Sequence, residues 1–314
     1  MIPGAWRLRF PLPWPAVPHV NAFALTAGES IVLVDTGTAA DGDLRPLELA
    51  LSQIGHGLED ISLLVCTHAH VDHYGLAKPI VDATGVPLWM HPAWEHIRGL
   101  DEDPAAARAA IANRAGVPAA ELQRYEAERG DQSWLAGIAE PDRELVPGVV
   151  VQSDLGDWHV HETPGHAPSH VVLHQPERRL LLSGDHLLGR VAIFLDYGHT
   201  PDPVGEMLLG LDRVAELDVG LVLAGHGRTF RDADAKVVAT REALERGLER
   251  ARKALAAGPA NAYDLLVRIA GAENVTASTA PFALQILLAQ LDRLQILGEV
   301  AASGDGAAPV WTLT

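Results

Sequence analysis

The sequence contains very little cysteine and no long apolar segment. Its single cysteine, Cys66, cannot form a disulfide within the chain, which fits a protein of a reducing compartment. No segment approaches the roughly 18 to 20 consecutive apolar residues that a membrane span requires. The first 20 residues include several prolines and lack the continuous apolar stretch of a signal peptide. We therefore expect a soluble cytoplasmic protein with no membrane partner.

Basic and aromatic residues are also scarce. The 314 residues include 24 Lys and Arg against 41 Asp and Glu, which gives a net charge of −17, and aromatic residues make up 5%. A chain this acidic repels polyanions, so avid non-specific binding of nucleic acid is disfavoured. The one basic concentration, in residues 241–253, is interleaved with glutamates and is typical of a solvated helix face. The composition favours a small-molecule substrate.

Short apolar runs alternate with helical patterns over the first 235 residues. Residues 31–34 form an uninterrupted apolar run, as expected of a strand covered on both faces. Further strands are predicted at residues 20–25, 61–66, 87–90, 149–151, 158–161, 171–174, 180–182 and 219–223. Helices are predicted at about 43–54 and 74–84. Alternating strands and helices indicate an α/β layered fold.

Residues 95–140 differ from this pattern, because they are rich in Ala, Glu and Arg and contain few β-branched residues. Helices are predicted at about 104–115 and 118–129. We interpret the segment as a helical insertion. A lid near the site and a helical layer that packs on a sheet are both open at this stage.

Residues 236–314, here called the C-terminal segment, predict a small second domain. A charged linker helix over 235–257 is followed by helices at 262–270 and 280–297 and by a β-hairpin that ends at 310–313. Two or three helices followed by a hairpin match a winged-helix pattern. A DNA-binding role is the non-enzymatic alternative. It is disfavoured because the segment beyond the linker helix contains few basic residues, Arg268 and Arg293.

Polar side chains that bind metals follow several predicted strands. The run Thr67 to His73 follows one strand, and His166, Asp185 and His226 each follow another. The carboxyl ends of strands are where α/β folds bind ligands. His68 and His70 are two residues apart in extended chain, so both imidazoles leave from the same side and can bind one ion. Imidazole and carboxylate ligands suit Zn²⁺, with iron and manganese as alternatives.

The run His68-Ala69-His70-Val71-Asp72-His73, with His166, Asp185 and His226 in this order, resembles the metallo-β-lactamase superfamily over roughly residues 15–230. The resemblance implies a four-layer αββα sandwich over residues 1–235. It implies that one metal ion is bound by His68, His70 and His166. It implies a second ion bound by Asp72, His73 and His226. In this family the residue that matches Asp185 bridges the two ions.

Other residues near these motifs receive supporting roles. Asp35 and Thr67 are predicted to orient the ligand loops without binding metal. Tyr197 and His199 follow the bridging aspartate along the chain and are candidate substrate contacts, although an ordinary loop role is open for His199. Cys66 and His170 are predicted to be structural. Eight further histidines lie in no motif and are assigned no role: His19, His56, His91, His96, His159, His161, His174 and His186.

The resemblance implies a metal-dependent hydrolase in which a metal-bridging hydroxide attacks the substrate. Asp72 and Asp185 are the predicted catalytic carboxylates, and Asp72 is a candidate proton donor to the leaving group. True β-lactamases usually lack the bridging aspartate, so Asp185 argues against antibiotic hydrolysis. We expect a small ester, thioester or lactone as substrate. Single-stranded RNA is the alternative, because the C-terminal pattern resembles lactamase-like endoribonucleases. The sequence leaves open whether the chain forms a homodimer.

Overall fold

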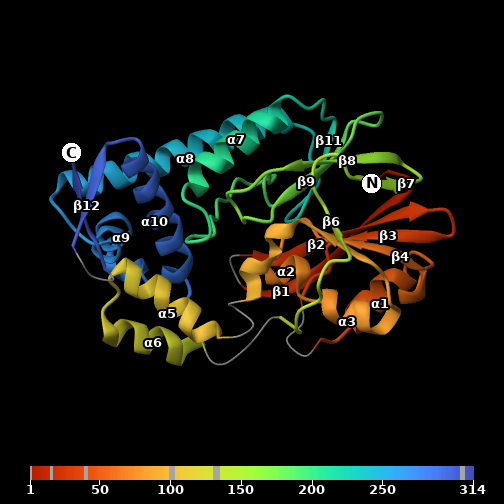
Figure 1. Ribbon diagram of the computed structural model, residues 1–314, viewed down its shortest axis with the longest axis horizontal. Helices are drawn as coiled ribbons and strands as arrows, with labels where there is room; N and C mark the ends of the chain where they lie inside the picture. Colours follow the sequence, from red (N-terminus) through yellow and green to blue (C-terminus); the bar gives the residue numbers. More distant parts are fainter. Residues whose placement is uncertain (1, 15–16, 39–41, 99–102, 130–134, 305–307) are drawn as a thin grey trace.

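The computed structural model describes residues 2–14, 17–38, 42–98, 103–129, 135–304 and 308–314. Its strands form two large mixed sheets and one small hairpin (Figure 1). The first sheet has the order β1 (Ala5–Trp14), β2 (Val17–Ala27), β3 (Ser30–Val34), β4 (Ile61–Val65), β5 (Leu88–Met90), β6 (Arg143–Glu144). The second has the order β11 (Leu221–Ala224), β10 (Leu180–Gly184), β9 (Val171–Gln175), β8 (Gly156–Glu162), β7 (Val150–Ser153).

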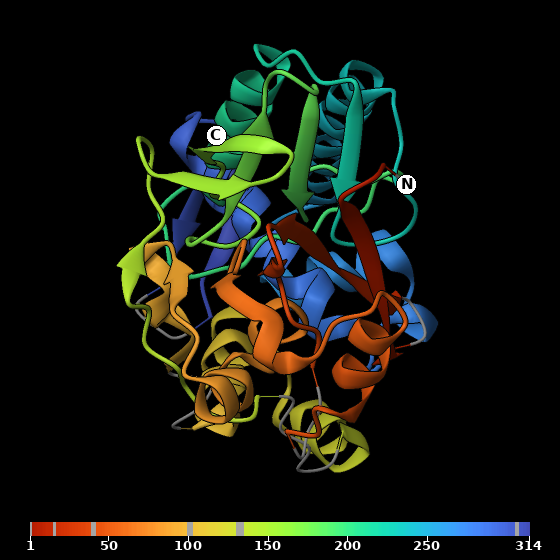
Figure 2. The ribbon, with the colours of Figure 1, turned by 90° about the vertical axis from the view of Figure 1, so that its right-hand side faces the viewer.

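The two sheets pack face to face because their apolar residues alternate between two cores. Along β3, Val32 and Val34 belong to the core that also contains Trp158, whereas Ile31 and Leu33 belong to a core on the opposite face. Successive strand residues point to opposite faces, so both faces of this sheet are covered. Figure 2 shows the first sheet in red to orange, apart from β6 in yellow-green, and the second in green to teal.

Helices cover the outer face of each sheet. On the first sheet, α1 (Arg45–Ser52) and α3 (Ala77–Thr84) contribute Leu47, Leu51 and Ile80 to the outer core. On the second sheet, Leu181 of β10 shares a core with Leu211 of α7 (Pro203–Ala215). The order helix, sheet, sheet, helix confirms the predicted four-layer αββα arrangement.

Strand ends from the two sheets meet along one edge. β3 and β4 are parallel, as are β10 and β11, so their carboxyl ends lie at the same edge of each sheet. The backbone N–H of Asn21 donates to Gly225 O at 2.7 Å, and the N–H of Val171 donates to Thr67 O at 2.9 Å. The Asn21 side-chain amide also donates to Ala224 O at 2.8 Å. These hydrogen bonds join a strand of each sheet to the strand end or loop of the other sheet, close to the predicted ligands.

The described part of the helical insertion packs partly on other helices and partly, through Ile97, Leu135 and Ala139, in the outer core of the first sheet. It contains η2 (Pro92–Ile97), α5 (Pro104–Ala115) and α6 (Ala119–Arg129). Ala112, Ala115 and Tyr125 join the core formed by the C-terminal segment, and the Tyr125 hydroxyl donates to Val275 O at 3.4 Å. Figure 1 shows α5 and α6 beside α9 and α10. A lid role stays a prediction, and residues 99–102 and 130–134 lie outside the described residues.

The C-terminal segment consists of helices and one hairpin, as predicted. It contains α8 (Ala233–Ala256), α9 (Ala262–Ala270), η3 (Ala272–Asn274), α10 (Ala280–Ile296), β12 (Val300–Ser303) and β13 (Val310–Leu313). Trp311 of the hairpin is fully buried, and its backbone pairs with Ala260. One apolar core extends from α7 into these helices. The winged-helix interpretation and the boundary at residue 236 stay predictions.

Two of the longer described elements, β1 and α7, were not predicted from the sequence. β1 contains Pro11, which a strand at the edge of a sheet tolerates because one side of its backbone is unpaired. α7 contains Gly205 and Gly210, which lower helix propensity. Its start is fixed by the Asp202 carboxylate, which accepts from the N–H of Gly205 at 2.8 Å. In the described part of the chain, no helix is long and apolar enough to cross a membrane.

Candidate metal centre

Four loops bring the predicted ligands to the shared edge of the two sheets. Residues 66–70 join β4 to α2 (Val71–Tyr74), while His166, Asp185 and His226 follow β8, β10 and β11. Gly165 has a φ of 113°, and a Cβ there would lie 2.6 Å from the backbone nitrogen of Met207. A Cβ at Gly225 would lie 2.7 Å from Cε1 of His73. Only glycine allows the loops to approach this closely.

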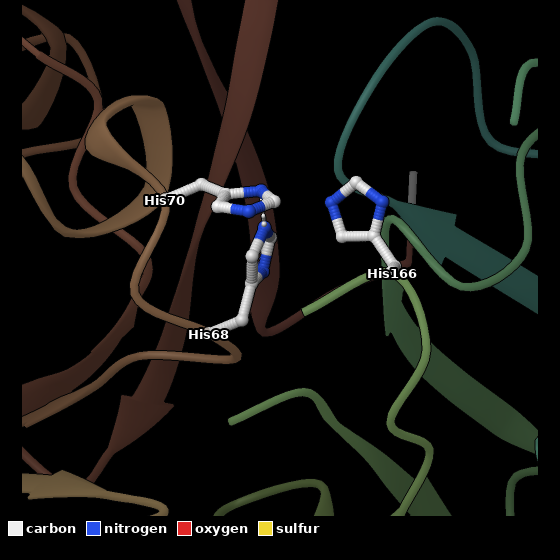
Figure 3. A group of neighbouring side chains, drawn as sticks. All are labelled: His68, His70 and His166. Atoms are coloured by element: carbon white, nitrogen blue, oxygen red, sulfur yellow. Dashed lines mark hydrogen bonds between the residues drawn. The ribbon is translucent and has the colours of Figure 1, made fainter. Parts of the chain in front are cut away.

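His68, His70 and His166 form the first group of potential ligands. The Nε2 atom of His68 lies 3.1 Å from Nδ1 of His70, and the ring of His166 lies 4.6 Å from that of His70. One nitrogen from each ring falls within a common distance of 4.8 Å. Figure 3 shows the three rings facing one another from loops on opposite sides. These are the residues that the family resemblance implies for one metal ion.

Asp72, His73 and His226 form the second group, and Asp185 lies between the two groups. Nε2 of His226 lies 3.2 Å from Oδ2 of Asp72 and 3.0 Å from Oδ2 of Asp185. Oδ1 of Asp185 lies 3.3 Å from Nε2 of His73, and its Oδ2 lies 3.7 Å from Nε2 of His166. The carboxylate of Asp185 is thus within reach of both groups.

Each of the five histidines has its outward nitrogen fixed by a neighbouring group. Nδ1 of His73 lies 2.8 Å from Oδ2 of Asp35. The remaining pairs are His68 Nδ1 with Thr67 Oγ1 at 3.0 Å, His166 Nδ1 with Phe194 O at 3.1 Å, His226 Nδ1 with His19 O at 2.7 Å, and His70 Nε2 with Asp196 Oδ2 at 3.4 Å. Such partners hold the rings of metal-binding histidines in one orientation. The other nitrogen of each ring faces the centre.

The donor atoms fit divalent metal ions. Nε2 of His166 and Oδ1 of Asp185 are buried and have no hydrogen-bond partner among the described residues. A buried polar atom without a partner is costly, and a metal ion that accepts its lone pair removes that cost. Five imidazoles and two carboxylates are a donor set typical of zinc, iron or manganese.

Asp35 supports the centre from a strained backbone. It has a φ of 62°, one of two positive values at described residues other than glycine. Its Oδ1 accepts from the N–H of Thr67 at 2.8 Å, and its Oδ2 accepts from the Thr67 hydroxyl at 3.0 Å. With the contact to His73, one buried carboxylate fixes both ends of the ligand run. The structure thus places Asp35 and Thr67 behind the ligands.

His170 lies behind Asp185 and away from the centre. Its Nε2 accepts from the backbone N–H of Asp185 at 3.0 Å, and its Nδ1 lies 2.9 Å from the Thr163 hydroxyl. A Cβ at Gly184 would lie 2.6 Å from this Nε2 atom. His170 therefore fixes the loop that carries the bridging aspartate, in line with its predicted structural role.

The two candidate substrate contacts lie in different surroundings. The Tyr197 side chain is mostly buried, and its hydroxyl accepts from Nε of Arg114 in α5 at 3.4 Å. The hydroxyl of Tyr197 therefore contacts the insertion. Nε2 of His199 lies 3.8 Å from Oδ1 of Asp196, next to His70. Only His199 is thus brought close to the predicted ligands.

Sequence reasoning missed several residues that contact the centre. Asp196 accepts from His70, and Nε2 of His96 lies 3.5 Å from the same Oδ2 atom. The carbonyl groups of Phe194 and His19 hold His166 and His226. Asp196 was detectable, because histidine ligands commonly pair with a carboxylate and this aspartate directly precedes Tyr197. A backbone carbonyl leaves no signal in the sequence.

Protonation of the metal-free centre predicts a pH dependence of metal binding. Burial opposes the charge on His226, but Asp185 and Asp72 raise its pKa to about 10. The pKa of His73 is also raised well above its usual value by Asp185, Asp72 and Asp35, despite burial. Both imidazoles are charged at neutral pH, and a metal ion displaces their protons. The apparent affinity should rise with pH by about tenfold per unit for each proton released.

Isothermal titration of the metal-free protein between pH 6 and 8, in two buffers of different ionisation enthalpy, measures this release directly. An affinity that is independent of pH, with no proton release in either buffer, would contradict the assignment of His73 and His226 as ligands.

The contact between Asp196 and His70 predicts a role in metal affinity. Asp196→Asn removes the charge that orients His70, so the affinity of one ion should fall about 10- to 100-fold. Metal retention against a chelator series measures the change, with Asp234→Asn on the exposed face of α8 as the matched control. Identical chelator midpoints for Asp196→Asn and Asp234→Asn would show that Asp196 does not orient a ligand.

Comparisons with known structures agree with this fold. The structure of a metallo-beta-lactamase family protein from Thermus thermophilus is 25% identical, with a TM-score of 0.86, and the match covers 100% of this chain and 99% of that one. The structure of a beta-lactamase domain protein from Burkholderia ambifaria is also 25% identical, with a TM-score of 0.82 and coverage of 100% and 92%. Both matches include the C-terminal segment.

The sequence comparisons agree with the structural ones. A curated relative, the probable metallo-hydrolase YqjP of Bacillus subtilis (strain 168), is 26% identical over 268 residues, which is 82% of each chain. The family model described as the metallo-beta-lactamase superfamily matches residues 16–226, two thirds of the chain and all seven predicted ligands. This chain therefore belongs to the metallo-beta-lactamase superfamily.

Proposed function

We propose that this chain is a hydrolase that binds two divalent metal ions and cleaves a small ester, thioester or lactone. The observation that carries the proposal is the position of Asp185, whose two carboxylate oxygens lie 3.3 Å from His73, 3.0 Å from His226 and 3.7 Å from His166. One carboxylate between two sets of donors is the arrangement that a pair of metal ions requires. The name of the Bacillus subtilis relative, a probable metallo-hydrolase, supports the reaction class.

The residues of the two groups would hold the ions, with zinc as the expected metal and iron or manganese as alternatives. When bound, such ions lower the pKa of a coordinated water and polarise the carbonyl group of an acyl substrate. His68, His70 and His166 would hold one ion. Asp72, His73 and His226 would hold the other.

The exposure of the ligands indicates the side from which substrate enters. The side chain of His70 is 19% exposed, that of His226 is 14% exposed and that of Asp72 is 12% exposed, whereas His73 is fully buried. Substrate therefore approaches past His70, His226 and Asp72. The buried rings behind them exclude water from the rest of the centre, which strengthens electrostatic interactions there.

Asp72 is the residue best suited to transfer a proton to the leaving group. Burial opposes its ionisation, but His73 and the hydrogen bond from His226 lower its pKa below the usual value. Asp72 is thus ionised at neutral pH, and Oδ2 is the atom on which it would receive a proton. Its place on the open side lets it pass that proton to a departing alcohol or thiol.

The surroundings of the basic residues argue against RNA as the substrate. On α8, Arg241 pairs with Asp212 at 2.5 Å, Arg246 with Glu242 at 3.4 Å and Arg252 with Glu299 at 2.5 Å. Pairing with carboxylates cancels the positive charge that would attract phosphates. With a net charge of −17, the chain is better suited to a small acyl compound.

The partners of its arginines likewise favour a packing role for the C-terminal segment over DNA binding. Arg268 donates to the carbonyl groups of Gly258 at 2.6 Å and of Ala254 at 3.3 Å. Arg293 pairs with Asp202 at the start of α7 at 2.6 Å. These arginines join helices to each other. We propose a winged-helix-like module that packs on the catalytic domain.

The proposal predicts that activity depends on both ligand groups. Asp185→Asn and His166→Ala should each lose bound metal. Each should also lower the rate of hydrolysis by more than about 100-fold, because replacing a residue that only orients a ligand typically lowers activity by roughly 10- to 100-fold. The assay uses an acyl-glutathione, an acyl-coenzyme A, a lactone and single-stranded RNA, with metal content measured on the same samples. Asp157→Asn, an exposed carboxylate on β8, is the matched control.

Full activity and full metal content in Asp185→Asn and His166→Ala would show that the centre is elsewhere. Hydrolysis of RNA alone by the unaltered protein would overturn the substrate assignment while leaving the metal centre intact.

A further inference from the structure

Two phenylalanine rings extend from the metal centre to the surface of the C-terminal segment. Phe194 lies in the loop between β10 and α7, and its ring packs edge-on against His70 at 5.5 Å and against His166 at 5.7 Å. Phe282, in the first turn of α10, packs edge-on against Phe194 at 5.7 Å. Half of the Phe282 side chain remains exposed, at 50%. The two rings form a continuous apolar surface that begins at two predicted ligands.

This surface is held in place by hydrogen bonds of the backbone. The carbonyl oxygen of Phe194 lies 3.1 Å from Nδ1 of His166, so the backbone of Phe194 cannot move without moving a ligand. The N–H of Tyr197, three residues further on, donates to Oε1 of Gln285 in α10 at 3.4 Å. The loop is therefore tied both to the centre and to the helix that carries Phe282.

Polar groups also lie around His70. Asp196 contacts Nε2 of that ring, and His96 and His199 lie beside Asp196. The surroundings of His70 thus combine an apolar ring, Phe194, with a group of polar side chains. A substrate with one apolar end and one polar end fits these surroundings.

We infer that Phe194 and Phe282 bind the apolar acyl group of the substrate, which makes Phe282 a specificity-determining residue contributed by the C-terminal segment. The inference rests on the proposed function, because it requires the scissile carbonyl to lie at the metal centre. From there, an acyl chain that runs along the ring of Phe194 meets Phe282 next. Single exposed apolar residues are common, but here one ring packs on two predicted ligands and the second ring extends that apolar surface outward, as expected of a surface that binds the apolar part of a substrate.

The distances define the length of acyl group that reaches Phe282. Its ring is no further from the ring of His70 than the sum of the two centroid distances, 5.5 Å and 5.7 Å. An extended chain advances about 1.3 Å per carbon–carbon bond of about 1.5 Å, so a chain of about eight carbons reaches the near edge of the Phe282 ring even at that greatest separation. An acetyl group is too short to reach it. Chain length therefore separates contact with the centre from contact with Phe282.

The inference is tested with acetyl and octanoyl esters of the same phenol and with the variants Phe282→Ala and Phe282→Leu. Phe282→Ala should lower the octanoyl-to-acetyl ratio of kcat/KM by about tenfold, because the apolar contact between the chain and this ring is lost. Phe282→Leu keeps an apolar side chain and should retain most of the ratio. Leu209→Ala, an exposed apolar residue on α7, is the control and should leave the ratio unchanged.

Metal content and thermal unfolding of each variant identify any loss of activity that reflects misfolding. The ratio of the kcat/KM values for the two substrates does not depend on the concentration of active enzyme. A ratio that Phe282→Ala leaves unchanged, or changes no more than Leu209→Ala does, overturns the inference alone. An effect of Phe282→Ala confined to RNA cleavage also overturns it, because the rings would then stack on bases. If the unaltered protein hydrolyses no ester, thioester or lactone, the proposed function falls and the inference falls with it.

Discussion

The contact of Asp185 with histidines from both ligand groups is the interaction on which the centre depends. It requires β10, β11 and the loop after β4 to end within a few ångströms of one another, although they belong to two different sheets. The hydrogen bonds from Asn21 to Gly225 and from Val171 to Thr67 hold those ends together. Glycine at 225 leaves room for the carboxylate. The sandwich therefore serves to bring distant segments of sequence to one point.

Much of the fold and the ligand set follows from short-range patterns. The uninterrupted run at 31–34 predicts β3, and the spacing of His68, His70, Asp72 and His73 predicts a metal-binding loop, because these patterns report local geometry. The family prediction is confirmed, and the structure brings the seven predicted ligands together. β1 and α7 were missed because proline weakens the sequence pattern of a strand and glycine weakens that of a helix. β1 forms because it lies at the edge of its sheet, and α7 forms because Asp202 caps its start.

The residues that sequence reasoning missed act through contacts between distant segments. Asp196 and His70 are 126 residues apart, and Phe194 and Phe282 are 88 apart, so neither pair forms a motif. The partners of His166 and His226 are backbone carbonyls, which any residue type supplies. The role of the C-terminal segment also depends on contacts that only the three-dimensional structure shows. Its helices share a core with α5 and α7 and carry Phe282 to the edge of the metal centre.

The account is tested most directly by anomalous diffraction from crystals of the metal-loaded protein. It predicts two peaks in each chain, one within about 2.0 to 2.2 Å of donor atoms of His68, His70 and His166 and the other equally close to Asp72, His73 and His226. Asp185 should contact both. A single peak, or two peaks of which one has no ligand among these residues, would contradict the central claim that one carboxylate joins two metal ions.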